Sequence, residues 1–362
     1  MKLGRKFRAA IAAGLAMVWA GSAGAVTPGA GGFSWSLQDT GLSGTSSAVA
    51  MRNGGVFPVV FNDFRGVAAQ FSSGWVPLGD PLFEPLSLSF PLRASSSPDG
   101  RVAAIGEEGG VVSLLPFSGF SVLPDVAAYE PGADETPLAG DFDPLGNLTT
   151  VSEFGVSGLP GPVSESFNGR ISDVAVSVNG DVAVVNENGQ FYEYNRFVAD
   201  WLEIDLNNLS PGISFFGTAS VAYDSLGRAH VLVDNGNQLI AADFNPQTGA
   251  FGFEVIANDK DTFFSDLAVN DFGVVGTSYE DDGVVYYAFK EGTAAWASVP
   301  VTNTNGFQDQ TGITFDHEGL PIVSYNDNGN IWIAYDPIVV PEPTATALLG
   351  FAGLALLRRR AA

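Results

Sequence analysis

Apolar residues between positions 26 and 340 form short runs in which hydrophobic and polar positions alternate. Alternation with a period of two is typical of β-strands that bury one face. Glycines next to Asn or Asp separate the runs, and these residues favour tight turns. This region lacks the three-to-four-residue apolar spacing of an amphipathic helix. The pattern therefore predicts an all-β chain of short strands joined by turns.

The turns recur at a regular spacing. Five turn glycines are separated by steps of 46, 81, 46 and 46 residues: Gly100, Gly146, Gly227, Gly273 and Gly319. Gly180 divides the long step, and Gly54 with Gly55 lies one period before the first of the five. A second turn follows nine or ten residues after a turn glycine, as in Asp234-Asn235-Gly236. Units of about 45 residues with four antiparallel strands are typical of β-propeller blades.

We therefore predict a single β-propeller over residues 33–338 with seven four-stranded blades. A six-bladed ring with one irregular insertion is the alternative, because the step from Gly146 to Gly180 is only 34 residues. The last unit ends at Asp336 without a fourth strand, whereas the apolar strand at residues 33–37 precedes the first unit without a partner. We expect this N-terminal strand to pair beside residues 330–335 and close the ring, which would remove two exposed sheet edges.

The N-terminus has the three parts of a secretory signal peptide over residues 1–25. A basic start is followed by an apolar stretch, residues 9–20, and by small residues at Ala23 and Ala25. Cleavage is expected before Val26, leaving a Gly-rich linker at 26–32. An uncleaved membrane anchor is the alternative, but the apolar stretch is shorter than the roughly 18 residues that span a bilayer.

The C-terminus, residues 339–362, also has three parts. Pro341-Glu342-Pro343 precedes an apolar run at 344–357, which is expected to be a short membrane helix, and Arg358, Arg359 and Arg360 follow it. Arginines at the end of such a helix hold that end on the cytoplasmic side. This tail resembles the PEP-CTERM sorting signal of Gram-negative bacteria. The resemblance implies processing by an exosortase-type membrane enzyme, transient residence in the inner membrane, and a final location at the cell surface or outside the cell. A plain membrane anchor is the alternative.

Charge narrows the range of partners. Four cations lie in the signal peptide and three in the tail, so nine of the 16 Lys and Arg remain against 40 Asp and Glu. The region between the two targeting segments, the exported body, therefore carries a charge of about −30. Such a surface argues against nucleic-acid binding, which needs clustered Lys and Arg. It also repels anionic lipid and anionic polysaccharide unless cations intervene.

Acidic turns are the candidate metal site. Asp234, Asp281, Asp282 and Asp327 occur at equivalent second turns, so a propeller would bring these turns to one face. Clustered carboxylates could hold Ca²⁺. The alternative interpretation, which we favour, is that Asp-Gly and Asn-Gly pairs supply the positive φ of tight hairpins. No resident cofactor is therefore expected, with Ca²⁺ as the exception to test.

The residues do not single out a catalytic site. His230 and His317 are the two histidines, and neither stands in a nucleophile or zinc motif. We therefore favour an exported, non-catalytic propeller that binds an exopolysaccharide or a surface protein. A secreted glycan hydrolase or lyase that uses carboxylates at the channel, and a calcium-dependent adhesion module, are the alternatives.

Overall fold

The computed structural model describes residues 33–335 except for fourteen internal segments. These segments are 53–56, 63–66, 72–73, 78–91, 98–100, 107–110, 115–125, 130–138, 153–154, 160–166, 210–213, 246–247, 259–263 and 306–309. The expected signal peptide, the linker and the sorting tail lie outside the described residues. Within the described part of the chain, no helix is both long and apolar enough to cross a bilayer.

The described strands form seven antiparallel sheets. We number them 1 to 7 in the chain order of their innermost strands, so the sheet that also contains the N-terminal strand is sheet 7. Sheets 1 to 3 contain β2 (Ser47–Arg52), β3 (Phe57–Asn62), β4 (Val67–Phe71) and β5 (Gly74–Pro77); β6 (Leu92–Ser96), β7 (Val102–Gly106), β8 (Val111–Leu114) and β9 (Val126–Tyr129); and β10 (Ala139–Phe142), β11 (Leu148–Ser152) and β12 (Gly155–Val156). Sheets 4 and 5 contain β13 (Ile171–Val176), β14 (Val182–Asn186), β15 (Gln190–Asn195) and β16 (Asp200–Asp205); and β17 (Thr218–Tyr223), β18 (Ala229–Asp234), β19 (Gln238–Asn245) and β20 (Ala250–Asn258). The short helix α2 (Leu206–Leu209) lies between these two sheets in the chain.

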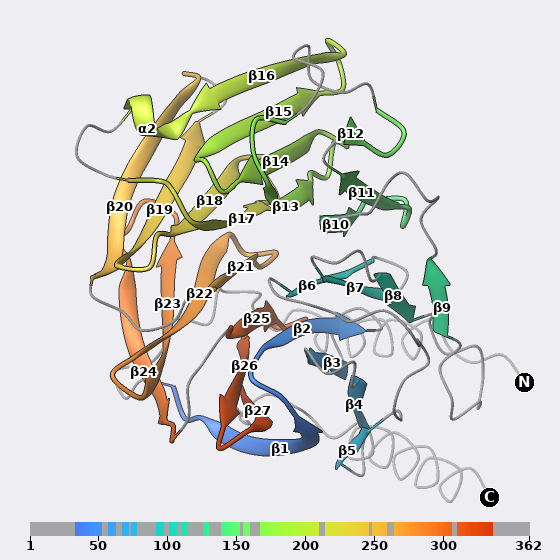
Figure 1. Ribbon diagram of the computed structural model, residues 1–362, viewed down its shortest axis with the longest axis vertical. Helices are drawn as coiled ribbons and strands as arrows, with labels where there is room; N and C mark the ends of the chain where they lie inside the picture. Colours follow the sequence, from blue (N-terminus) through green and yellow to red (C-terminus); the bar gives the residue numbers. More distant parts are fainter. Residues whose placement is uncertain are drawn as a thin grey trace, which may run out of the picture.

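Sheets 6 and 7 complete the ring. They contain β21 (Asp266–Val269), β22 (Val274–Asp281), β23 (Val284–Glu291) and β24 (Ala297–Asn303); and β25 (Gly312–Phe315), β26 (Pro321–Asp327), β27 (Asn330–Tyr335) and β1 (Ser36–Ser43). The first strands of the sheets contact one another in the cyclic order β2, β6, β10, β13, β17, β21, β25 and back to β2. Figure 1 shows these inner strands around the middle of the molecule and the later strands toward its rim. The chain is therefore a single β-propeller.

The N-terminal strand closes the ring. β1 pairs antiparallel with β27, with Ser36 opposite Tyr335 and Ser43 opposite Asn330. The buried hydroxyl of Thr40 also donates a hydrogen bond to the carbonyl oxygen of Ile331 at 2.7 Å. The prediction that the first strand would pair beside residues 330–335 is confirmed, although β1 extends to Ser43 and begins at Ser36.

Four strands per unit hold for six of the seven sheets. Sheet 3 has three strands among the described residues, and its last strand, β12, has only two residues. This is the unit with the short 34-residue step in the sequence. A shorter step leaves less chain for a fourth strand, in keeping with three strands among the described residues.

Inner-strand turns share one hydrogen-bonding pattern. In sheet 5, the carboxylate of Asp224 accepts hydrogen bonds from the backbone N–H groups of Leu226 and Arg228, both at 2.9 Å. Asn270 in sheet 6 accepts the equivalent bonds through its amide oxygen. Gly227 closes the turn at a φ of 74°, where a side chain would be strained. The repeated Asp or Asn three residues before a Gly is therefore a side-chain-capped turn.

Apolar side chains fill the space between neighbouring sheets. In one buried cluster, Phe191 of sheet 4 and Phe244 of sheet 5 pack with ring centroids 5.5 Å apart. Trp201 and Phe253, two of the fourth-strand aromatics, pack against such clusters. Phe33 lies 5.4 Å from the ring of Tyr287 in sheet 6, so the N-terminal segment also covers the neighbouring sheet.

Candidate functional site

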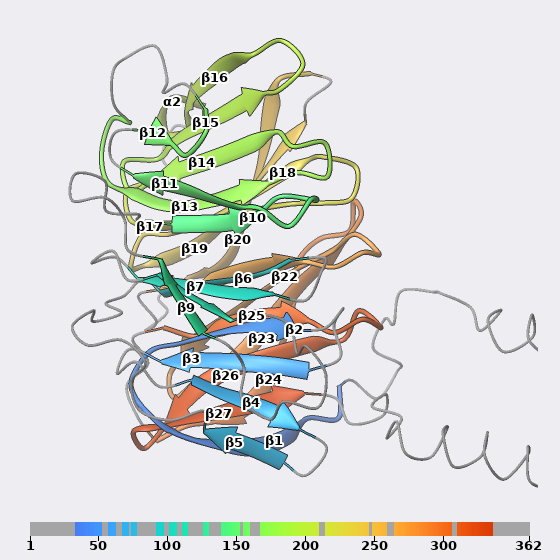
Figure 2. The ribbon, with the colours of Figure 1, turned by 90° about the vertical axis from the view of Figure 1, so that its right-hand side faces the viewer.

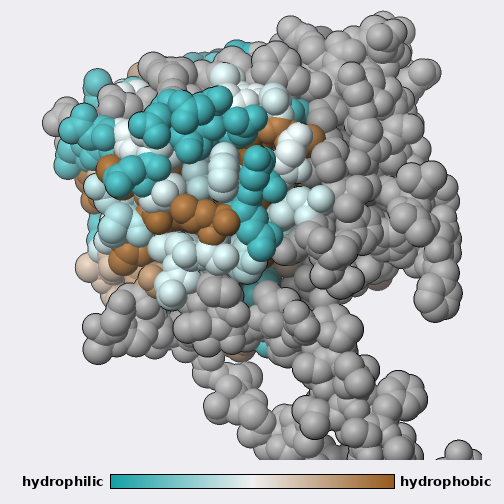
Figure 3. Space-filling view, turned by 90° about the horizontal axis from the view of Figure 1, so that it is seen from below, coloured by the Kyte–Doolittle hydropathy of each residue, from teal (hydrophilic) through white to brown (hydrophobic). Residues whose placement is uncertain are grey.

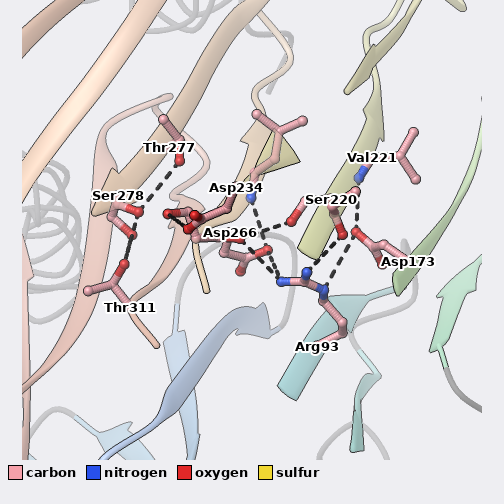
Figure 4. A network of polar contacts seen from close by, with 12 residues as sticks. Arg93, Asp173, Ser220, Val221, Asp234, Asp266, Thr277, Ser278 and Thr311 are labelled. Atoms are coloured by element: carbon pink, nitrogen blue, oxygen red, sulfur yellow. Dashed lines mark hydrogen bonds and ion pairs between the residues drawn. The ribbon is translucent and has the colours of Figure 1, made fainter. Parts of the chain in front are cut away.

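A buried arginine lies at the centre of the ring. Arg93 is on β6 of sheet 2, and its guanidinium forms ion pairs with Asp173 on β13 and Asp266 on β21. The closest distances are 3.8 Å from Nε to Asp173 and 3.5 Å from Nη1 to Asp266. Figure 4 shows the two carboxylates approaching the guanidinium from different sheets. We call Arg93, Asp173 and Asp266 the axial cluster.

Arg93 reaches across the axis to the opposite side of the ring. Its Nη2 donates a hydrogen bond to the carbonyl oxygen of Ala219 in sheet 5 at 3.0 Å, and Nη1 lies 3.5 Å from that of Ser265. One side chain from sheet 2 thus touches sheets 4, 5 and 6. It is only 4% exposed. The guanidinium therefore links inner strands that are far apart in the sequence.

Each aspartate of the axial cluster also connects its own sheet to the next. Asp173 accepts a hydrogen bond at 3.0 Å from the backbone N–H of Val221 on β17. Asp266 accepts one from the backbone of Ile313 on β25. In sheet 3, Asp141, two residues further along its strand, accepts a similar inter-sheet bond at 2.8 Å from the backbone N–H of Val176 on β13. Inner-strand carboxylates thus fasten successive sheets at three places in the ring.

Burial controls the charge of these carboxyl groups. Burial raises the pKa of Asp173 to about 7, although the neighbouring Arg93 cation opposes the shift. Burial also raises the pKa of Asp266, with Arg93 again acting in the opposite direction. One cation faces two carboxyl groups, and their titrations are coupled. The cluster is charge-balanced when the pair of carboxyl groups holds one proton.

Arginine beside a carboxyl group that titrates near neutrality can also occur in an active site. Here the oxygens of Asp173 and Asp266 already accept backbone hydrogen bonds, and each residue is 7% exposed. A substrate would have to displace these contacts to reach the carboxylates. The arrangement therefore connects the inner strands of several sheets to one another.

A second polar network joins sheets 5 and 6. Nδ1 of the buried His230 lies 2.7 Å from Oδ1 of Asp243, and Lys290 donates a hydrogen bond to Oδ2 of the same carboxylate at 2.8 Å. Burial opposes ionisation, but the hydrogen bonds from His230 and Lys290 lower the pKa of Asp243 to about 2. Lys290 also lies 3.4 Å from Glu254. The network ties β19 and β20 to β23.

The four aspartates of the candidate metal site lie at three separate second turns, with Asp281 and Asp282 sharing one of them. Asp234 is buried and accepts a hydrogen bond from Gly236 N–H at 3.0 Å, and Asp327 accepts one from Asn305 N–H at 2.9 Å. Asp282 has a φ of 53° and is followed by Gly283 at 74°, as hairpin geometry requires, and Asp281 precedes this turn at the end of β22. In the described part of the chain, no three His, Cys, Asp or Glu residues are placed to hold a metal ion. The positions fit the hairpin interpretation.

The remaining sequence-predicted residues have separate locations. His317 is largely exposed in the first turn of sheet 7, 3.7 Å from the Glu318 carboxylate, and far along the chain from the axial cluster. The signal-cleavage residues, Ala23, Ala25 and Val26, and the sorting-motif residues, Pro341 to Pro343 and Arg358 to Arg360, lie outside the described residues.

Sequence reasoning missed the axial cluster, but the repeat contained a signal for it. The three members stand seven residues before the turn glycines Gly100, Gly180 and Gly273. The same position in other units holds small residues, namely Ala139, Ser220 and Gly312. One arginine and two aspartates at an otherwise small, inner-strand position predict an ion-paired cluster at the axis.

Comparisons with known proteins show the fold alone. No protein-family model and no curated protein sequence matches this chain. Among solved structures, YCF48 bound to a D1 peptide is similar, with a TM-score of 0.56, 16% identity, and coverage of 85% of this chain and 97% of that one. YCF48 from Cyanidioschyzon merolae has a TM-score of 0.54 and 13% identity, covering 84% and 99%. The β-propeller domain of Cps50 from Myceliophteria thermophila has a TM-score of 0.52 and 12% identity, covering 81% and 97%.

Proposed function

We propose that this protein is an exported, non-catalytic β-propeller that binds an exopolysaccharide or a surface protein at the cell surface or in the extracellular matrix. The axial cluster is the observation that carries the proposal. Its arginine and carboxylates are engaged with one another and with the backbone of sheets 4 to 7, so the ring centre offers packed structure in place of a reactive pocket. The binding surface is then the outside of the ring.

The ring itself supports a binding role. We infer that each of the seven sheets corresponds to one blade, with sheet 3 as the short one. Inter-blade ties such as Asp173 to Val221 hold the inner strands rigidly, and a rigid scaffold can present its turns for recognition at low entropic cost. A structurally similar propeller, YCF48, is described as bound to a peptide, which supports a protein ligand beside a polysaccharide as a class to test.

Binding is tested with the exported body on glycan arrays and in pull-downs from the producing cells. Neutral glycans or a surface protein should be retained, whereas anionic glycans should bind only when divalent cations are added, because the body carries about −30 charges. Heat-unfolded protein is the control for unspecific retention. Release of new reducing ends from a retained glycan would contradict the non-catalytic part of the proposal.

We propose further that the C-terminal tail is a processed sorting signal. Replacing Pro341, Glu342 and Pro343 with alanine should leave export intact, because the signal peptide is unchanged, but should hold the full-length protein in the inner membrane. Fractionation and immunoblotting measure both effects. A variant that still reaches the medium at the wild-type size would show that another protease removes the tail.

A further inference from the structure

Exposed apolar side chains gather on the tips of several neighbouring turns. Turns between the first and second strands, and between the third and fourth, lie on one face of the ring, which we call the first-turn face. Figure 2 shows the ring from the side, with strand hairpins turning back at its two faces. Five large apolar residues on this face are between 58% and 83% exposed: Leu145, Val178, Phe197, Val198 and Leu226. We call them the apolar tips.

The apolar tips belong to adjacent turns of sheets 3, 4 and 5. The charge of Arg196, beside Phe197, acts on the Asp143 carboxylate in the turn of sheet 3. The Arg196 guanidinium also lies against Gly180, so the two turns of sheet 4 touch. Toward sheet 5, the side-chain amide nitrogen of Asn179 lies close to Gly227, 3.5 Å from the point that a Cβ atom on this glycine would occupy. The turns that carry the tips therefore lie next to one another on this face.

Turn chemistry does not explain these side chains. Leu145 and Leu226 occupy turns whose geometry is fixed by hydrogen bonds to Asp143 and Asp224, and Asn195 does the same for Phe197 and Val198. The tip side chains make no contribution to these bonds, and polar residues would suit the positions equally well. Figure 3 shows another side of the molecule, where the coloured surface mixes hydrophilic and hydrophobic residues. Several large apolar residues exposed on neighbouring turns indicate an apolar partner.

Both ends of the ring-forming chain leave on this same face. Tyr335, the last residue of β27, pairs with Ile322, which directly follows the first turn of sheet 7. Ser36, the first residue of β1, lies opposite Tyr335. Eight residues, 336–343, separate β27 from the apolar run at 344–357. Fully extended, they reach about 28 Å. A bilayer that accepts this run would thus lie close to the first-turn face.

We propose that the apolar tips dock the first-turn face onto a lipid bilayer of low net charge. Insertion of side chains at loop tips buries apolar surface without bringing the acidic body into the hydrocarbon region. A charge of about −30 disfavours an anionic surface, so neutral phospholipid is the partner that this face fits. This inference stands apart from ligand binding, because polysaccharide or protein could bind elsewhere on the ring.

The absence of cysteine from the sequence allows a direct test with the full chain. Leu226→Cys and Asn237→Cys place single thiols near the two ends of β18, about 20 Å apart along the strand. Asn237 is exposed in the second turn of the same sheet, so it is the matched control. Each variant carries an environment-sensitive fluorophore and is reconstituted into phosphatidylcholine vesicles that contain nitroxide-labelled lipid.

We expect nitroxide quenching of the label at position 226 to exceed that at position 237 at least threefold. Adding Leu145→Ser, Val178→Ser and Phe197→Ser to the Leu226→Cys chain should reduce quenching to the control level, with thermal unfolding unchanged. Equal quenching at both positions, or quenching that survives the serine substitutions, would overturn the proposal. Stronger quenching in vesicles with anionic lipid would also overturn it. Shielding of the label that depends on protein concentration in the absence of lipid would overturn it too, because it would indicate a second copy of the chain as the partner.

Discussion

At the scale of single residues, Arg93 has the largest structural role that the molecule reveals. Its buried guanidinium is shared between Asp173 and Asp266 and also contacts the backbone of sheet 5. Removing one partner of a buried ion pair leaves a desolvated charge behind, which costs far more than the pair itself contributes. Substitutions in the axial cluster therefore test whether its ion pairs stabilise the fold.

Arg93→Met should lower the free energy of unfolding by about 3–5 kcal/mol, because two buried carboxyl groups lose the cation that pairs with both of them. Urea unfolding of the exported body measures this change. Arg170→Met is the control: Arg170 pairs with Glu187 at 3.4 Å while largely exposed, and it should lose less than about 1 kcal/mol. Adding Asp173→Asn and Asp266→Asn to Arg93→Met should restore part of the stability. If Arg93→Met lost no more unfolding free energy than Arg170→Met, the stabilising role of the axial cluster would be contradicted.

The raised pKa of Asp173 predicts a pH dependence of stability. Its folded-state pKa of about 7 lies above the unfolded value of about 3.9, so the protonated form is favoured by folding. This contribution is complete below about pH 4 and is lost as the pH rises through about 7. The stability of wild type minus that of Asp173→Asn should thus fall by up to about 4 kcal/mol between pH 4 and 8. A difference that stays constant over this range would show that Asp173 is ionised throughout.

At the scale of elements, capped turns set where each inner strand ends. Asp224, Asn270 and Asp316 accept backbone hydrogen bonds in equivalent turns of sheets 5, 6 and 7. The carboxylate and the amide are thus interchangeable as acceptors, and the turn needs one oxygen in a defined place. Of these three turns, only the turn of sheet 5 also carries one of the apolar tips, Leu226.

Asp224→Ala should destabilise the exported body by at least about 1 kcal/mol, because two backbone N–H groups of the turn lose their acceptor. Asp224→Asn should cost less, since Asn270 performs the same task in sheet 6. Thermal unfolding measures both variants. Asp271→Ala, at an exposed position of the sheet 6 turn, should stay within about 0.5 kcal/mol of wild type. Equal losses for the alanine and asparagine variants at position 224 would rule out the capping role.

At the scale of the whole molecule, closure of the ring depends on a pairing between chain ends. β1 covers the edge of β27, and Gln38 lies next to Tyr335 across a separation of 297 residues. Residues this far apart meet only late in folding, because loop closure opposes the contact. In return, β27 is paired on both sides, and Ile331 and Ile333 are fully buried.

Deleting residues 33–43 from the exported body should lower the midpoint of thermal unfolding by at least about 5 °C. The edge of β27 would then be open to pairing with other molecules, so concentration-dependent association is also expected. Calorimetry and light scattering measure the two effects. Deleting only residues 26–32 is the control and should leave the midpoint unchanged. An unaltered midpoint after the longer deletion would mean that β1 is not needed to hold the ring closed.

The sequence by itself determined the elements, their order and their closure. Alternating apolar residues specify strands, Asp or Asn before Gly specifies turns, and the 46-residue period specifies repeated sheets, because each is a local property of the chain. The unpaired strand at residues 33–37 likewise predicted closure. Only the tertiary structure decided which side chains meet at the axis. Arg93, Asp173 and Asp266 are 80 to 173 residues apart in the sequence, and their contact depends on how seven sheets are arranged around one centre. Burial there, and not the residue types alone, raises the pKa of Asp173.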